Sequence, residues 1–219
     1  MNTIQDYLAQ AQLSLAAYGN FSIGAISPAD LINPSVGMDS AHAAQFASTY
    51  SVLDQYTNPS NGLSATVFKN NQTGEVTVAI RGTQDVNDLL TDAWDIALLG
   101  TRGFQSQYAN LKTKLDQWLQ DPAVLKGQNF EVTGHSLGGF LATGIAADYA
   151  ANVTHTYLYN APGVGGLLGS LNPVSSLLNL FGVANLPDPA KISNLKADAG
   201  LSPIAGLGSQ MSSVVPIVI

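Results

Sequence analysis

Ser136 is the residue of this chain best placed to do chemistry. It lies in the run Gly134-His135-Ser136-Leu137-Gly138-Gly139, which contains the pattern Gly-x-Ser-x-Gly. A serine hydroxyl is a weak nucleophile at neutral pH, so it needs a base to take its proton and donors to hold the oxyanion. Between a strand and a helix, this pattern puts the serine on a tight, strained turn. Gly134 and Gly138 are therefore predicted to be steric requirements of the turn.

The residues on both sides of the turn agree with this prediction. Residues 130–133 are a short strand-like run, and small residues from 140 to 150 are typical of a helix. The N-terminus of that helix would point at the reaction centre, so the backbone amide of Leu137 is a predicted oxyanion donor. The alternative interpretation is a glycine-rich turn that only requires a small residue at position 136.

Hydrophobic periodicity predicts the elements that position this turn. Apolar residues in 1–18 and in 104–118 repeat at spacings of 4 and 3, which is typical of amphipathic helices. The runs 63–69 and 75–80 predict a hairpin. Strands alternating with helices in the middle of the chain predict a mostly parallel sheet with helices on both faces, in one domain over residues 1–219. Further helices are expected over about 39–55 and 88–99, and further strands over 154–159, 191–196 and 214–219.

The composition restricts the partners and the chemistry. Of 219 residues, 46% are hydrophobic and 11% charged, which is typical of a compact domain. The net charge of −7 and the lack of a basic cluster exclude nucleic acid and an anionic membrane surface as electrostatic partners. The absence of cysteine excludes disulfides, thiolate metal sites and a cysteine nucleophile. Residues 1–18 lack the basic start and apolar core of a secretory signal.

Three short motifs together resemble the class 3 lipases, a family with the α/β-hydrolase fold. They are the serine run after Phe-Glu-Val-Thr, the upstream run Val-Ala-Ile-Arg-Gly-Thr at 78–83, and Asn-Ala-Pro-Gly at 160–163. The likeness covers roughly residues 63–208 and is greatest to bacterial lipase-like domains attached to calcium-binding glycine-rich repeats. It implies hydrolysis of lipid esters through an acyl-enzyme, no required cofactor and an extracellular location. It leaves calcium dependence open.

The resemblance also implies a second oxyanion donor, the backbone amide of Thr83. The residues agree, because Thr83 follows the carboxyl end of a predicted strand, where sites form in open α/β sheets. The alternative interpretation is a turn that ends the strand, with Asp85 capping the next helix.

The base is the missing part of the predicted triad. His42 lies upstream on a predicted helix, His135 lies inside the turn and His155 starts a strand about 16 Å from the edge where catalytic groups gather. None of them fits the order serine, acid, histidine. We therefore expect that the catalytic histidine is absent from this chain, and that the 219 residues are a truncated form or fragment ending inside the strand 214–219.

Asp198 is the predicted acid. It lies 62 residues after Ser136 (198 − 136 = 62) and just past the expected strand 191–196, and its surroundings resemble the acid loop of the lipase-like domains. Asp188 is the reserve candidate, although the prolines at 187 and 189 are also typical of a plain turn. An interpretation of Asp198 as a turn residue stays open.

Two apolar segments are candidates for the acyl-chain pocket or lid, residues 89–99 and 167–181. The alternative for each is an ordinary core helix. The prediction from the sequence is an acyl-ester hydrolase acting on a lipid or short-chain ester, with transient contact at a lipid interface. Its rival is a crippled or non-catalytic α/β-hydrolase domain that binds lipid or a protein partner, because removal of the base leaves only residual catalysis.

Overall fold

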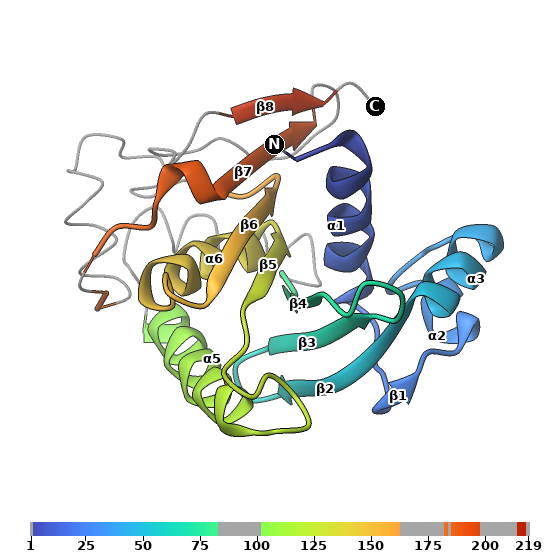
Figure 1. The fold of residues 1–219 in the computed structure, drawn as a ribbon, viewed down its shortest axis with the longest axis horizontal. Coiled ribbons are helices and arrows are strands. Elements are labelled where there is room, and N and C mark those ends of the chain that lie inside the picture. The colour runs from blue at the N-terminus through green and yellow to red at the C-terminus, as the bar shows by residue number, and fades with distance from the viewer. Residues whose placement is uncertain (1, 83–101, 163–181, 184, 198–213, 218–219) are drawn as a thin grey trace.

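One mixed sheet organises the molecule. The computed structural model describes residues 2–82, 102–162, 182–183, 185–197 and 214–217. Within these ranges eight strands follow one another across the sheet in chain order (Figure 1). They pair antiparallel from β1 to β4 and parallel from β4 to β8. The strands are β1 Gly24–Ala25, β2 Tyr50–Asn58, β3 Leu63–Asn70, β4 Val76–Ile80, β5 Phe130–His135, β6 Val153–Tyr159, β7 Ile192–Ala197 and β8 Val214–Ile217.

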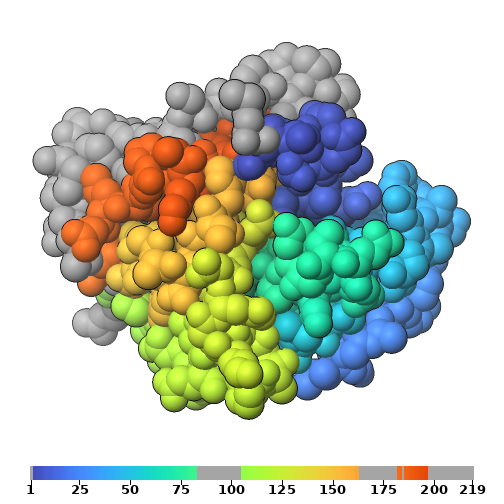
Figure 2. All heavy atoms as spheres, viewed as in Figure 1, coloured from blue at the N-terminus to red at the C-terminus, as the bar shows by residue number. Residues whose placement is uncertain are grey.

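Helices cover both faces of the sheet, as predicted. The alternation along β4 separates the two faces: Val78 and Ile80 pack in the cluster that includes α5 and α6, whereas Ala79 packs in the cluster of α1 and α3. Figure 2 shows α1 beside the β3–β4 hairpin on the outside of the molecule. The helices are α1 Ile4–Ala16, α2 Pro28–Ile32, α3 Ser40–Thr49, α5 Arg102–Gln120 and α6 Leu137–Asp148, with a 3-10 turn η2 at Pro189–Lys191.

Most predicted elements are confirmed within two or three residues. The hairpin is β3–β4, the 104–118 periodicity lies in α5, and the strand before Ser136 is β5. The helix predicted over 88–99 lies outside the described residues. No helix of the described part of the chain is long and apolar enough to cross a bilayer.

The helix predicted over about 39–55 is wrong beyond Thr49. α3 ends there, and the following nine residues form β2, which pairs with β3 from Tyr50 to Asn58. Phe46 and Tyr50 do pack together, with ring centroids 4.7 Å apart, but across the junction between helix and strand. A ladder of backbone hydrogen bonds to β3 is available only in the folded chain, and this pairing outweighs a local helical period.

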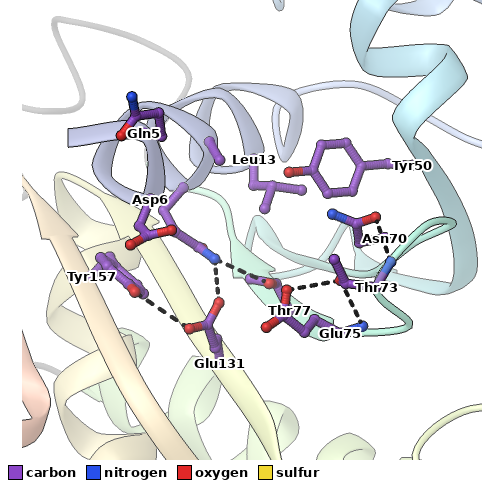
Figure 3. Close-up of a pocket in the computed structure, with 12 residues that line it drawn as sticks. Gln5, Asp6, Leu13, Tyr50, Asn70, Thr73, Glu75, Thr77, Glu131 and Tyr157 are labelled. Carbon is purple, nitrogen blue, oxygen red and sulfur yellow. Dashed lines mark hydrogen bonds between the residues drawn. The ribbon is translucent and has the colours of Figure 1, made fainter. Parts of the chain in front are cut away.

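α1 buries a different face from the one that its apolar spacing indicates. Ile4 and Leu8 are 69% and 59% exposed, whereas Gln10 is only 6% exposed. The Gln10 Nε2 donates to Thr77 Oγ1 at 3.3 Å and to Glu131 Oε2 at 2.5 Å, which places α1 over polar residues of the sheet (Figure 3). Because burial of a polar group requires a hydrogen-bond partner, the side chains of β4 and β5 decide which face of α1 turns inward.

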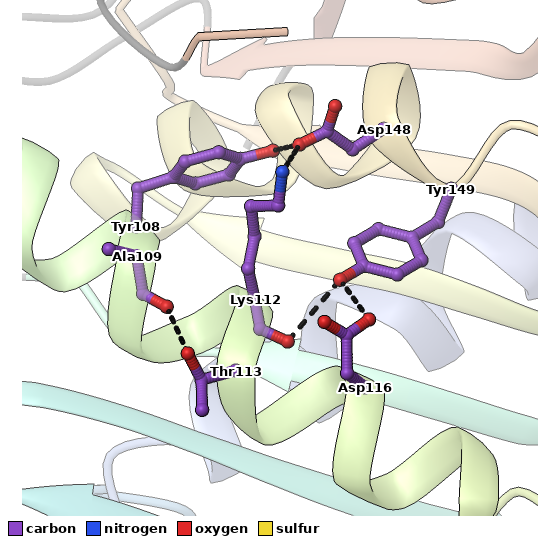
Figure 4. A network of polar contacts seen from close by, with 7 residues as sticks. All are labelled: Tyr108, Ala109, Lys112, Thr113, Asp116, Asp148 and Tyr149. Carbon is purple, nitrogen blue, oxygen red and sulfur yellow. Dashed lines mark hydrogen bonds and ion pairs between the residues drawn. The ribbon is translucent and has the colours of Figure 1, made fainter.

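α6, which begins directly after Ser136, is fixed to α5 by a polar network (Figure 4). The Tyr108 hydroxyl donates to Asp148 Oδ2 at 2.8 Å, and Lys112 Nζ lies 2.5 Å from the same oxygen. One residue further on, the Tyr149 hydroxyl donates to Asp116 Oδ1 at 2.8 Å. Hydrogen bonds to charged partners are among the stronger ones in proteins, so the C-terminal end of α6 is held firmly while its N-terminal end carries the serine.

Candidate active site

Ser136 occupies a strained turn between β5 and α6. Its φ of 56° and ψ of −126° are unusual for a residue with a side chain, and such conformations cost about 1–3 kcal/mol. Neighbouring backbone holds the turn in place: the Ser136 N–H donates to the Tyr159 carbonyl at 2.8 Å, and the Gly139 N–H donates to the Ser136 carbonyl at 3.0 Å. This is the geometry of a nucleophile elbow, in which strain presents the serine at the end of a strand.

The steric role predicted for the two glycines is confirmed. A Cβ on Gly134 would lie 2.4 Å from the Gly138 carbonyl carbon, and a Cβ on Gly138 would lie 2.1 Å from the Ile80 oxygen. Both neighbours are backbone atoms, which cannot rotate away. The N-terminus of α6 therefore packs directly on the end of β4, and only glycine permits that approach.

The Ser136 hydroxyl is buried and forms no hydrogen bond with any residue that the structure describes. The residue is 4% exposed, and its Oγ has no hydrogen-bond partner among the described residues. A buried hydroxyl without a partner costs about 1–3 kcal/mol, so it needs an explanation, of which a catalytic role is one. Among the described residues nothing occupies the hydroxyl, which leaves it available to a substrate or to a base.

The structure describes all three histidines of the chain, and each has a polar contact with a residue other than Ser136. His42 pairs with the exposed Asp39 at the start of α3. His135 Nδ1 lies 3.1 Å from the Tyr18 hydroxyl oxygen, and His155 Nε2 lies 2.8 Å from Ser193 Oγ. None of these contacts is to the serine, and the expectation that no histidine of this chain serves as its base stays a prediction.

Two backbone amides were predicted to form the oxyanion hole. Leu137 is the first residue of α6, so its N–H is one of the four that a helix leaves without an intrahelical partner, next to the serine. Gly82 follows β4 and touches the elbow, since a Cβ there would lie 3.3 Å from Ser136 Cβ and 2.6 Å from the His135 oxygen. Thr83 lies outside the described residues, but its predecessor Gly82 is at the elbow.

The two predicted acids flank opposite ends of strand β7 in the sequence, and only one of these ends is near Ser136. Because β4 to β7 are parallel, their carboxyl ends meet at the edge where Ser136 lies. Asp188 is at the opposite end of β7, where its carboxylate accepts the Ala190 N–H at 2.9 Å and caps the η2 turn. The turn interpretation of Asp188 is confirmed. Asp198 follows the last residue of β7, Ala197, and itself lies outside the described residues, as do the apolar segments 89–99 and 167–181.

Tyr18 is a residue at the elbow that the sequence did not identify. It follows α1 and directs its hydroxyl at His135 Nδ1, and the backbone of Gly82 lies close to the same hydroxyl oxygen. Burial raises the pKa of Tyr18 to about 12 and lowers the pKa of His135. At neutral pH the phenol is therefore protonated and the imidazole is neutral. In the sequence, the only feature that marks Tyr18 is its place at the end of the apolar repeat 1–18.

A cavity of about 280 Å³ lies under α1, at the other end of the sheet from Ser136. Asp6, Glu75 and Glu131 line it (Figure 3). Glu131 precedes Ser136 by five residues on the same strand, which corresponds to about 16 Å. The cavity is therefore not the pocket for a substrate of this serine. Among the described residues, no group of three or more His, Cys, Asp or Glu could hold a metal ion.

A family model matches most of the chain. Residues 9–166, which include Tyr18, the end of β4 and the elbow, match a phospholipase-like family, the Tle-like phospholipase domain. No curated protein matches this chain by sequence.

Solved structures of lipases share the fold. Lip2 lipase from Yarrowia lipolytica is 20% identical, with a TM-score of 0.52, over 88% of this chain and 70% of that one. A triacylglycerol lipase from Penicillium expansum is 16% identical, with a TM-score of 0.56, over 96% and 78%. A triacylglycerol lipase whose catalytic centre is formed by a serine protease triad is 18% identical, with a TM-score of 0.53, over 90% and 72%. These matches confirm the predicted lipase-like α/β-hydrolase fold.

Proposed function

This chain belongs to the Tle-like phospholipase domain family, and on that basis we propose that it hydrolyses carboxylic esters of lipids with Ser136 as the nucleophile. The observation that carries the proposal is the state of the serine itself. Its backbone is strained at φ 56°, and its buried hydroxyl has no hydrogen-bond partner in the described part of the chain. Both features cost stability and both favour attack on a bound ester, because a strained, pre-positioned nucleophile needs little reorganisation.

In the proposed reaction, Ser136 Oγ attacks the ester carbonyl carbon while a base takes the hydroxyl proton. The carbonyl oxygen becomes an oxyanion, held by the Leu137 amide and, in our proposal, by the Thr83 amide. Collapse of this intermediate breaks the bond to the alcohol, which leaves with a proton, and Ser136 carries the acyl group as an ester. Water then attacks that ester and releases the fatty acid. We propose Asp198 as the acid that orients the base, from the carboxyl end of β7.

A second candidate is favoured by the histidines. His42, His135 and His155 all contact groups other than Ser136, which supports the proposal that no imidazole of this chain serves the serine. The chain's own turnover is then limited to what the oxyanion hole and substrate binding provide. In this case the domain binds an acyl ester or a lipid surface without efficient turnover.

One experiment separates the two candidates. The protein is incubated with a fluorophosphonate ester, with and without added imidazole, and the labelled residue is located by peptide mass. We expect added mass on Ser136, and faster labelling with imidazole, because the free base can replace the missing side chain. Ser136→Ala is the control at each imidazole concentration.

The possible outcomes of this experiment support different candidates. Labelling that imidazole accelerates supports a hydrolase site that needs an additional base. Rapid labelling without imidazole means that a base is already present, which contradicts the second candidate. Folded protein that stays unlabelled in imidazole contradicts the proposed hydrolase and supports the binding domain.

A further inference from the structure

Three segments that are far apart in the sequence meet at one hydroxyl group. Tyr18 comes from the N-terminal segment, where its own N–H donates to the Leu15 carbonyl at 3.1 Å and continues the last turn of α1. Its hydroxyl reaches His135, 117 residues away, at the end of β5. The same oxygen lies against the backbone of Gly82, at the exit from β4, where an added Cβ would come within 2.7 Å of it. The hydroxyl therefore lies where the elbow meets the strand that leads to the second predicted oxyanion donor.

The fit around this hydroxyl is close. A Cβ on Gly82 would lie 2.7 Å from the Tyr18 oxygen, 2.6 Å from the His135 carbonyl oxygen and 3.3 Å from Ser136 Cβ. Gly82 is thus enclosed between the phenol on one side and the elbow on the other. A change in the position of the phenol would be transmitted to the peptide that precedes Thr83.

The proton positions in this contact follow from its chemistry. A phenol has one proton to donate and lone pairs to accept. The Tyr18 O–H can donate to His135 Nδ1, which lies 3.1 Å away. In that arrangement the acceptor nitrogen is unprotonated and the neutral ring carries its proton on Nε2. The lowered pKa of buried His135 is consistent with a neutral ring.

We propose that Tyr18 is a positioning residue of the active site: its hydroxyl joins the exit of β4 to the nucleophile elbow and fixes His135 as the Nε2–H tautomer. Tyr18 does not touch the reacting atoms. It sets the separation between Ser136 and the backbone that continues into Thr83. This inference rests on the proposed function, because the separation matters only if Ser136 attacks a carbonyl whose oxygen is held by both sides.

Tyr18→Phe is the matched test, because it removes one oxygen atom and keeps the ring. The control is Tyr149→Phe, which also removes a tyrosine hydroxyl with a close partner, Asp116 at 2.8 Å, but between α5 and α6. Two readouts are compared. One is the tautomer of His135, from long-range ¹H–¹⁵N spectra of the imidazole. The other is the rate at which a fluorophosphonate labels Ser136 in the presence of imidazole.

We expect His135 of the wild-type protein to be the Nε2–H tautomer and to lose this preference in Tyr18→Phe. Labelling of Ser136 in that variant should slow by about tenfold or more, since small displacements of catalytic groups have effects of this size. Tyr149→Phe should leave both readouts unchanged. Thermal unfolding of both variants controls for a general loss of stability.

Two results would overturn the inference. One is a wild-type His135 protonated on Nδ1, which needs no variant and therefore holds even if Tyr18→Phe fails to fold. The other is a folded Tyr18→Phe protein with unchanged tautomer and labelling rate. If wild-type Ser136 is never labelled, the proposed function fails, and the His135 spectra alone decide the structural role of Tyr18: a changed tautomer supports it and an unchanged one overturns it.

Discussion

Replacement of Glu131 by glutamine is expected to make the protein more stable above neutral pH and to remove a pH dependence of its stability. Glu131 lies under α1, and burial, followed by the charge of Glu75, raises its pKa from 4.5 to about 7. The folded state therefore holds this proton more tightly than the unfolded chain does. The resulting stabilisation is complete below pH 4.5 and is lost as the pH rises through 7.

The size of the effect follows from the two pKa values. The difference between about 7 and 4.5 is about 2.5 pH units, and at about 1.36 kcal/mol per unit this gives roughly 3 kcal/mol as an upper value. The Tyr157 hydroxyl, which donates to Oε1 at 3.3 Å, already moderates it. In a glutamine one carboxylate oxygen becomes an NH2 group, so Tyr157 can donate to the remaining carbonyl, whereas the Gln10 amide, which donates to Oε2, must turn so that its Oε1 accepts from the new NH2 group. The Gln10 Oε1 has no partner among the described residues, so the variant removes the charge and leaves a partner for each polar group.

The assay is denaturant unfolding at several pH values between 4.5 and 8.5, for wild type and Glu131→Gln. The free energy of unfolding of the variant minus that of wild type should rise with pH by up to about 3 kcal/mol. Taking this difference cancels groups common to both proteins, such as His135, whose lowered pKa acts in the opposite direction. Glu75→Gln is the control, because it removes only a neighbouring charge and should give a smaller rise. A difference that is flat across this pH range would refute the reasoning.

Two further predictions concern the elbow. Ser136→Gly should raise the free energy of unfolding by about 1 kcal/mol relative to Ser136→Ala, because glycine relieves the strain at φ 56° while alanine does not; equal stabilities in chemical unfolding would contradict a strained backbone. Gly138→Ala should lower the free energy of unfolding by 2 kcal/mol or more, at the order of magnitude of a severe core clash, because its Cβ would meet the Ile80 oxygen at 2.1 Å. Gly127→Ala is the control for backbone strain without a clash, since Gly127 has a φ of 70° but its Cβ would meet nothing closer than 4.0 Å. A loss of stability at position 138 no larger than at position 127 would count against the close approach.

Local patterns predicted the elements whose own residues determine them. α5 repeats its apolar positions over about four turns, and the β3–β4 hairpin combines β-branched runs with a five-residue polar connection, so each is specified within its own segment. β2 was missed because Tyr50 to Asn58 becomes a strand only by pairing with β3. The buried face of α1 was missed for a related reason, since Gln10 turns inward to reach Thr77 and Glu131.

The candidate site also contains residues that the sequence predicted and residues that it did not. The elbow was predictable because its glycines, its serine and its flanking elements are contiguous in the chain. Tyr18 was not predictable, because its role depends on a contact with a residue 117 positions away. The place of His155 in a strand was a reason, available from the sequence, to expect that it is not the base. For His135 the sequence showed only its position inside the turn, because its partner Tyr18 is seen only in the folded structure.

The elbow combines two unfavourable features at a single residue, and the surroundings explain how the fold tolerates them. Ser136 has a strained backbone and a buried hydroxyl without a partner among the described residues, and a glycine at this position would avoid both costs. The strain persists because neighbouring backbone holds the turn in place. Gly138 of α6 packs on the Ile80 carbonyl of β4, and the Ser136 N–H donates to the Tyr159 carbonyl of β6. A structural turn would need neither the hydroxyl nor its burial. The glycine-rich turn interpretation accounts for Gly134 and Gly138 but not for the serine, and a nucleophile accounts for all three.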